Sequence, residues 1–216
     1  MTYSLNEIDA LCRKAARGAG YNWGHAEDAG KAARWLQSLG LPGAEILLNC
    51  LNEGTTPQTI LTIENANWRG DGPLCPLVTG ASLSDHAATL ASDTITLHDV
   101  RHPILLAPFA AAIAAQTHLA TRLEWPGASV TIHGQDAQTD GDQTDGDQKA
   151  LLATSAPQVT CRHVPAPTQT SARHQHRALL TADIYNRLAA FAQRTYAPAT
   201  EASRKAGAGA GLGDND

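Results

Sequence analysis

Helical and strand-like patterns are unevenly distributed along this chain of 216 residues. Residues 4–20 and 25–40 carry apolar side chains at spacings of three and four, which is typical of helices with one buried face. Short β-branched runs, such as that at 93–100, appear only later, and a last helical pattern follows Thr181. Because long strands and helices never alternate, we expect an α+β fold with helices at the N- and C-terminal ends packed on a central, mostly antiparallel sheet.

The length of the chain suits one domain with one sizeable core, and we expect a single domain over residues 1–216. Its parts would be a helical N-terminal segment at 1–54 and a mixed strand and helix core at 55–178. Within that core, residues 134–149 are expected to form an acidic loop. A C-terminal helix and a glycine-rich tail would occupy 179–216.

Two local signals mark element boundaries clearly. Ser4 and Glu7 have the spacing of a capping box, in which two otherwise unpaired backbone N–H groups at the start of a helix are satisfied. Leu123 and Trp125 alternate with polar residues before a Pro-Gly dipeptide at 126–127, which predicts a β-hairpin.

Other boundaries in the middle of the chain are set by proline and glycine. Residues 68–76 have the composition of a loop. Pro76 is expected to start a helix that continues to Leu90. Residues 102–119 are expected to form one buried helix with a kink at Pro108.

The five residues TDGDQ occur twice in succession at 139–148. A calcium loop of the D-x-D-x-D-G type is the functional alternative, and Asp140 and Asp142 fit its first two ligand positions. Thr144 takes the third position and Gly146 falls one residue late. We therefore interpret the repeat as a duplication in a surface loop, where insertions are tolerated.

Charge and hydropathy exclude several classes of partner. The net charge is −5 and only 17% of residues are charged. Lysine and arginine do not cluster, so we expect neither a nucleic-acid partner nor attraction to an anionic membrane. The apolar run at 103–115 is too short to span a bilayer, and residues 1–9 lack the basic start of a signal peptide. We therefore expect a cytoplasmic protein.

The cysteines are scattered and form no C-x-x-C pair; they are Cys12, Cys50, Cys75 and Cys161. This pattern is typical of small buried side chains in a reducing compartment. A hydrolase that uses Cys12 or a serine as nucleophile stays open as a third functional reading, because nothing in the sequence excludes it.

The histidines suggest metal sites only weakly. His98 and His102 have the H-x3-H spacing of helical zinc ligands. Pro103 disfavours helix at the residue before it, so the two side chains are not expected to share a helical face. His174 and His176 share a strand face at best. We expect no metal.

Motifs for catalysis and for nucleotides also fail on geometry. Ser84, Asp85 and His86 are consecutive, and adjacent side chains cannot adopt the geometry of a catalytic triad. The glycines at 18–24 and 207–213 lack the G-x-G-x-x-G spacing. We therefore expect no cofactor.

The end of the chain, SRKAGAGAGLGDND, combines cations, small residues and acids. Alternating glycine and alanine allow backbone N–H groups to converge on an anion, and Ser203 and Arg204 lie directly before them. Asp214 and Asp216 provide carboxylates for an ammonium group. The sequence therefore suggests a site for a small anionic or zwitterionic molecule, whereas a frayed acidic tail is the alternative.

Two long stretches carry a resemblance to a known family. LCRKAARGAGYNWGHAEDAGKAARWL at 11–36 and RTYAPATEASRKAGAGAGLGDND at 194–216 resemble a bacterial family without an assigned function, domain of unknown function family 3726. The resemblance implies that both ends of the chain belong to family motifs, and it implies no reaction. The acidic repeat at 139–148 would then be an insertion particular to this chain.

The resemblance also directs attention to the N-terminal helical pair. It implies that Arg17, Trp23 and Glu27 line one pocket together with the tail, with Trp23 as an apolar wall. The matched basic residues also include Arg13, Lys14 and Arg34. A helix surface with one packing tryptophan is the alternative.

We therefore expect a protein that binds a small-molecule ligand through Arg17, Trp23, Glu27 and the tail. The alternative is an accessory subunit whose tail inserts into a partner enzyme and becomes ordered there. Whether the chain is itself an enzyme stays open.

Overall fold

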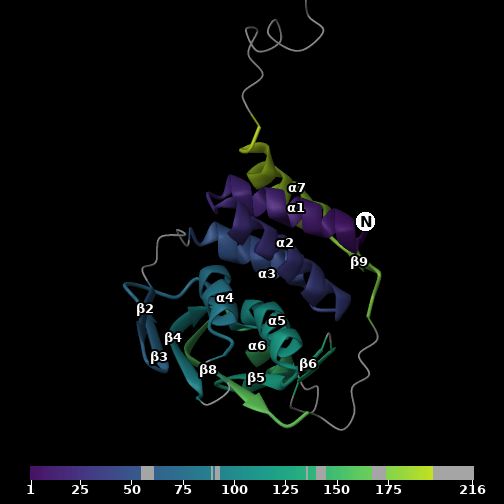
Figure 1. Cartoon of the computed structure of the whole chain (residues 1–216). Helices are drawn as coiled ribbons and strands as arrows, with labels where there is room; N and C mark the ends of the chain where they lie inside the picture. The colour runs from purple at the N-terminus through teal and green to yellow at the C-terminus, as the bar shows by residue number, and fades with distance from the viewer. Residues whose placement is uncertain are drawn as a thin grey trace, which may run out of the picture.

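The computed structural model describes residues 1–54, 61–88, 90, 93–134, 136–139, 145–166 and 174–196. The expected α+β class is confirmed (Figure 1). The helices are α1 (Leu5–Gly18), α2 (Trp23–Ser38), α3 (Gly43–Asn52), α4 (Pro76–Asp85), α5 (Ala107–Thr117), α6 (Asp145–Leu151) and α7 (Ala182–Gln193), with a 3₁₀ turn, η2 (Pro103–Leu106). The strands are β1 (Thr2–Ser4), β2 (Leu61–Glu64), β3 (Asn67–Gly70), β4 (Ile95–Arg101), β5 (Ala120–Trp125), β6 (Ala128–His133), β7 (Asp136–Thr139), β8 (Ser155–Val164) and β9 (Arg177–Leu179).

The main sheet has the strand order β2-β3-β4-β8-β5-β6-β7. Every neighbouring pair is antiparallel except β3 and β4, so the sheet is mostly antiparallel, as expected. The hairpin prediction is confirmed: Leu123 pairs with Val130, and the turn at 126–127 places Gly127 at a φ of 81°. A positive φ is the conformation that glycine adopts without steric cost.

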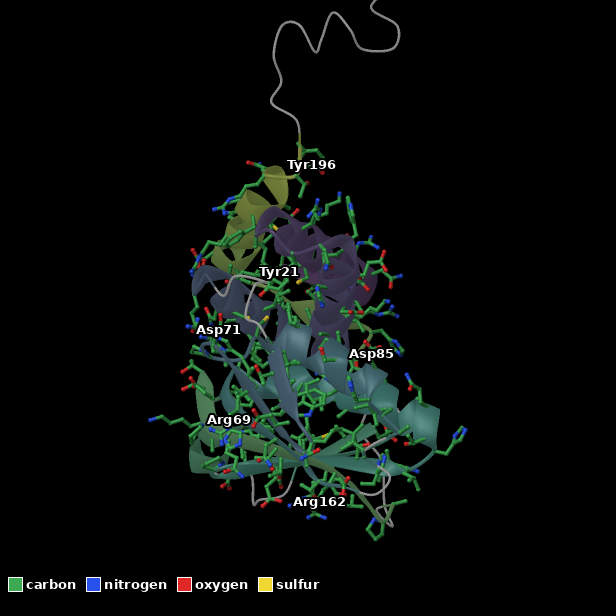
Figure 2. All side chains as sticks on the ribbon, turned by 60° about the vertical axis from the view of Figure 1, so that its left-hand side comes forward. Tyr21, Arg69, Asp71, Asp85, Arg162 and Tyr196 are labelled. Carbon is green, nitrogen blue, oxygen red and sulfur yellow. The ribbon has the colours of Figure 1, made fainter. Side chains whose placement is uncertain are left out.

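The molecule is layered, with the sheet at one end and the terminal helices at the other. Figure 1 shows α4 and α5 on the sheet, α2 and α3 above them, and α1 with α7 farthest from the sheet. Figure 2 shows Arg69 and Arg162 at the sheet end and Tyr196 at the opposite end. One buried cluster fills the space between the sheet and α5, and a second joins α1, α2, α3 and α7.

The N-terminal helices begin and end close to the predicted positions. The capping box is present, since the Glu7 carboxylate accepts from the Ser4 backbone N–H at 2.7 Å while Glu7 N–H donates to the Ser4 hydroxyl at 3.3 Å. Alanines dominate the α1–α2 contact; they are Ala15, Ala16, Ala26, Ala29 and Ala33. Their short side chains let the two helix backbones approach closely.

Both predictions for residues 68–90 are wrong. Residues 68–70 form strand β3 instead of a loop, because Trp68 is almost completely buried and anchors the strand in the core. Helix α4 ends at Asp85, with His86 as its C-cap, well before Leu90.

The segment at 102–119 is not one kinked helix. It divides into η2 and α5, and Pro108 lies in the first turn of α5. A proline there costs no helical hydrogen bond, because the first N–H groups of a helix have no partner within it. Pro108 therefore helps to start α5 and does not bend it.

The expected acidic loop at 134–149 is also partly regular structure. Strand β7 extends the sheet at Asp136–Thr139, and α6 begins at Asp145 within the second TDGDQ unit. Contacts of α6 with the rest of the fold explain why: the indole of Trp125 on β5 donates to the Ala150 carbonyl at 3.0 Å, and Leu151 is buried. Tertiary packing thus selects a helix that the repeat alone does not suggest. Asp140, Asp142 and Thr144 lie outside the described residues.

A small two-stranded sheet joins distant parts of the chain. Strand β1 pairs antiparallel with β9, with Tyr3 opposite Ala178. The terminal ammonium of Met1 donates to the Leu180 carbonyl at 2.9 Å. The sequence did not predict this pairing, which fixes the segment before α7 beside the N-terminal helices. Among the described residues, no helix is long and apolar enough to cross a membrane.

Candidate functional site

Arg17 and Trp23, two of the predicted site residues, are in contact at one end of the helical pair. The Arg17 guanidinium lies over the Trp23 ring, 5.0 Å from its centroid, and Nη1 donates to the Tyr21 carbonyl at 2.7 Å. Trp23 is 66% exposed. In the described part of the chain it therefore forms a surface and not the wall of an enclosed pocket.

Glu27 lies one helical turn after Trp23 on α2. Its carboxylate is 4.0 Å from the Lys31 ammonium, and both side chains are more than half exposed. Such a pair contributes little to stability because water screens it. The structure thus brings Arg17 and Trp23 together, whereas the carboxylate of Glu27 interacts with Lys31.

The tail residues Ser203, Arg204, Asp214 and Asp216 lie outside the described residues. The chain is described as far as Tyr196, whose hydroxyl is 3.3 Å from the Lys14 ammonium on α1. Helix α7 also packs closely on α1, since a side-chain carbon added at Gly18 would clash with the Phe191 carbonyl. The last described turn of the chain therefore lies against the N-terminal helical pair.

A hollow with cationic side chains in its lining lies beside α2. It has a volume of about 490 Å³ and is lined by Leu5, Lys31, Arg34, Trp35, Ser38 and residues 174–176. Lys31, Arg34, Trp35 and Ser38 are spaced by three and four, so one face of α2 presents all of them. We call this hollow the α2 cleft.

Backbone bonds hold the other wall of the α2 cleft in place. Gln175 N–H donates to the Ser38 carbonyl at 2.7 Å, and Leu5 N–H donates to the His176 carbonyl at 3.4 Å. The β1–β9 pairing begins directly after this segment, at Arg177. Residues 174–176 are thus fixed between the C-terminal end of α2 and the start of α1.

His174 connects this wall to α2 and to the sheet. Its Nε2 is 2.9 Å from the Asp136 carboxylate on β7, and its Nδ1 is 3.2 Å from the Ser38 hydroxyl. Ser38 itself donates to the Trp35 carbonyl at 2.7 Å. These contacts fix the orientation of the His174 ring between α2 and β7.

The α2 cleft therefore carries an excess of positive charge. Within the described residues, Arg34 forms no ion pair, and the nearest acid to Lys31 is the exposed Glu27. Asp136 faces His174, and both side chains are about one-third exposed. A guanidinium without a carboxylate partner beside an ammonium and two imidazoles can bind a carboxylate or a phosphate.

A second polar cluster surrounds Glu53 at the end of α3. Its carboxylate lies 3.1 Å from His102 Nε2 and 3.3 Å from Arg101 Nη1. His102 is nearly fully buried and has a left-handed φ of 41°. Burial lowers the pKa of His102, and the neighbouring Glu53 opposes that effect. His98 instead contacts Asn67, so the H-x3-H pair is divided between different partners.

We expect the lowered pKa of His102 to make the protein less stable in mild acid. The unfolded chain binds a proton at His102 more readily than the folded chain does, so this stability is present above about pH 6.5 and is lost as the pH falls. In His102→Asn, chosen because asparagine tolerates a positive φ, the loss of Tm between about pH 7.5 and pH 5.5 should be smaller. Equal slopes in both proteins would contradict this assignment.

The cysteines are all buried and none forms a disulfide, as expected. Burial raises the pKa of Cys161 to about 12 and raises that of Cys12 as well. Both therefore stay as neutral thiols, which argues against Cys12 as a nucleophile. The Tyr21 hydroxyl contacts the Cys75 sulfur at 3.2 Å in the interior of the helical layers (Figure 2).

The N-terminal part of the chain matches a known protein family. Residues 3–100 match the model of DUF3726, a family of proteins of unknown function. The predicted resemblance is thereby confirmed for the stretch at 11–36, whereas the stretch at 194–216 lies outside the match. The DUF3726 match covers α1 to α3, the α2 side of the cleft and most of β4, and it does not include residues 174–176 or the tail. A search of curated proteins finds no match to the chain.

Sequence analysis identified only some of the residues that line the α2 cleft. Arg34 belongs to the stretch that resembles DUF3726, and His174 and His176 were weighed as a metal pair. Trp35, Ser38 and Asp136 were not singled out. The polar face of α2 was readable from its spacing, but the partner wall depends on contacts that span 136 positions between Ser38 and His174.

Proposed function

We propose that the protein binds a small anionic or zwitterionic metabolite in the α2 cleft. The observation that supports this most directly is the convergence of Lys31, Arg34, His174 and His176 on one hollow of about 490 Å³. This volume lies within the range of ordinary small-molecule sites. Arg34 is the main anchor, because its planar guanidinium matches a carboxylate or phosphate in two hydrogen bonds.

The remaining groups suit an anion with a second polar group. The imidazole of His174 is held in place by Asp136 and Ser38, so it offers a fixed polar group to the ligand. His176 and Lys31 lie at the exposed rim, where they attract the ligand and are screened by salt. The proposal includes the tail. Its polar residues would contact the bound molecule; they are Ser203, Arg204, Asp214 and Asp216.

Replacement of Arg34 by glutamine tests the proposal. With inorganic phosphate and succinate as probes, we expect the dissociation constant measured by calorimetry to rise about 10- to 100-fold, as for loss of a charged hydrogen-bond pair. The matched control is Arg187→Gln on α7, which removes the same charge from an exposed pair with Asp183. If the parent binds neither probe, or if both variants bind like the parent, the α2 cleft is not an anion site.

A second candidate function is that of an accessory subunit with a partner enzyme. It is favoured by two exposed aromatic side chains, Trp23 (66% exposed) and Tyr196 (62% exposed), each paired with a cation of α1. Aromatic and arginine side chains are enriched in protein interfaces.

Truncation and substitution separate this candidate from the metabolite site. A complex formed by the full chain and lost both without residues 207–216 and in Trp23→Ala would support the subunit role. Retention of the complex by both variants would contradict it. If Arg34→Gln loses phosphate binding but still forms the complex, metabolite binding belongs to the α2 cleft and does not depend on the partner enzyme.

A further inference from the structure

We infer that the ligand of the α2 cleft is amphipathic, with its acidic group in the cleft and an apolar body in an adjacent cavity. This inference rests on the proposed function and specifies the class of molecule. The cavity has a volume of about 420 Å³ and lies between the C-terminal end of α2, strands β6 and β7, and α6. We call it the apolar cavity.

The lining of the apolar cavity differs in character from that of the α2 cleft. Most of its lining is aliphatic, including Leu39, Leu41, Ile104, Val130, Ala137 and Leu151. Neither lysine, arginine nor histidine lines it among the described residues. Burial of hydrocarbon there is favourable because it removes apolar surface from water.

Trp35 belongs to both hollows, which places them side by side. A third hollow, of about 480 Å³, continues the same path: it shares Gln175 with the α2 cleft and shares Gly40 and Leu41 with the apolar cavity. The three hollows thus surround the last turn of α2. An elongated molecule that lies along Trp35 would contact both the cationic and the aliphatic region.

The indole N–H of Trp35 supports a ligand at this junction. The nitrogen is buried and has no hydrogen-bond acceptor within the described part of the protein. A buried donor without an acceptor is unfavourable. Because the nitrogen is closed off from solvent, a carboxylate or carbonyl oxygen in the hollows would accept from it after the Trp35 ring turns toward the ligand on binding.

Polar side chains in the lining of the apolar cavity limit the length of the apolar body. Ser129 on β6, Thr139 on β7, and Asp147 and Gln148 on α6 line it together with the aliphatic residues. These polar side chains suit a short chain or ring that ends in a polar group better than a long acyl chain. The class we infer is therefore a monocarboxylic or phosphorylated acid with a medium-sized hydrocarbon body.

Titration with acetate, octanoate and 1-octanol tests the inference, with inorganic phosphate as the probe of the α2 cleft alone. Complete burial of one methylene strengthens binding by up to about fourfold, so octanoate should bind at least about 30-fold more tightly than acetate. Octanol, which lacks the acid, should bind more weakly than octanoate. Equal affinities for octanoate and acetate would overturn the inference.

Two phenylalanine substitutions on β7 locate the hydrocarbon. Ala137→Phe fills the apolar cavity and should abolish the octanoate advantage while phosphate binding stays unchanged. In Gln138→Phe, the matched control, the added ring lies on the opposite face of the strand, and the advantage should persist. If Ala137→Phe folds poorly, Ala128→Leu narrows the same cavity and serves in its place.

The failure of this inference is distinguishable from that of the proposed function. If phosphate binds through Arg34 but octanoate has no advantage over acetate, only the apolar cavity is excluded. If octanoate binds equally well to the parent and to Arg34→Gln, the acid does not lie in the α2 cleft, and the inference is overturned. If neither phosphate nor octanoate binds, both proposals fail.

Discussion

Alanine in place of Gly18 is expected to lower the free energy of unfolding by about 2–4 kcal/mol, although alanine is the better helix former. Gly18 is the last residue of α1, and a methyl group there would clash with the Phe191 carbonyl. The obstacle is backbone, which cannot move aside as the end of a flexible side chain can. Helix α7 would have to shift away from α1 and expose Leu188 and Phe191, which are now buried.

Gly24→Ala provides the matched control for this prediction. Gly24 lies in the first turn of α2, and an added methyl group there would meet only the Asn22 side chain at an ordinary contact distance of 3.6 Å. We expect it to be neutral or stabilising by up to about 1 kcal/mol. Urea unfolding followed by circular dichroism measures both. A similar stability change in the two variants would show that α7 does not depend on close contact with α1.

The terminal helices were predictable because their signals are local. The capping box of Ser4 and Glu7, the N-cap Thr181 and the apolar spacings each lie within a few residues of the element they define. These signals act through backbone hydrogen bonds close in sequence, and tertiary contacts only reinforce them.

The parts that the sequence missed depend on distant contacts. Strand β9 is three residues long and exists because β1 offers an edge 175 positions away, measured from Thr2 to Arg177. The interpretation of residues 68–70 as a loop failed because the burial of Trp68 outweighed the composition around it. Propensity is a weak guide wherever packing decides the conformation.

The candidate site was also predictable only where it depends on residues close in the sequence. The face of α2 that carries Lys31, Arg34 and Trp35 follows from helical spacing, but its opposite wall follows from β1–β9 pairing and from the contact of His174 with Asp136. Sequence reasoning instead favoured the tail and Trp23. Trp23 proves to be exposed, and the tail lies outside the described residues.

Removal of the Trp125 side chain is the other substitution with a large expected effect, and it tests whether α6 belongs to the fold. Trp125 is almost fully buried, and its indole donates to the Ala150 carbonyl of α6. Trp125→Ala should lower the free energy of unfolding by about 3–5 kcal/mol, because it leaves a large cavity under α6. Trp125→Phe keeps most of the packing and should cost about 1–2 kcal/mol, mainly through the lost hydrogen bond.

The variant Trp125→Ala also tests how α6 contributes to ligand binding. Helix α6 contributes Asp147, Gln148 and Leu151 to the apolar cavity and nothing to the lining of the α2 cleft. In Trp125→Ala, under conditions where the protein stays folded, the octanoate advantage should therefore fall while the phosphate affinity stays near that of the parent. Equal losses for both probes would mean that the two hollows depend on one another, and α6 would then support the whole site and not only its apolar part.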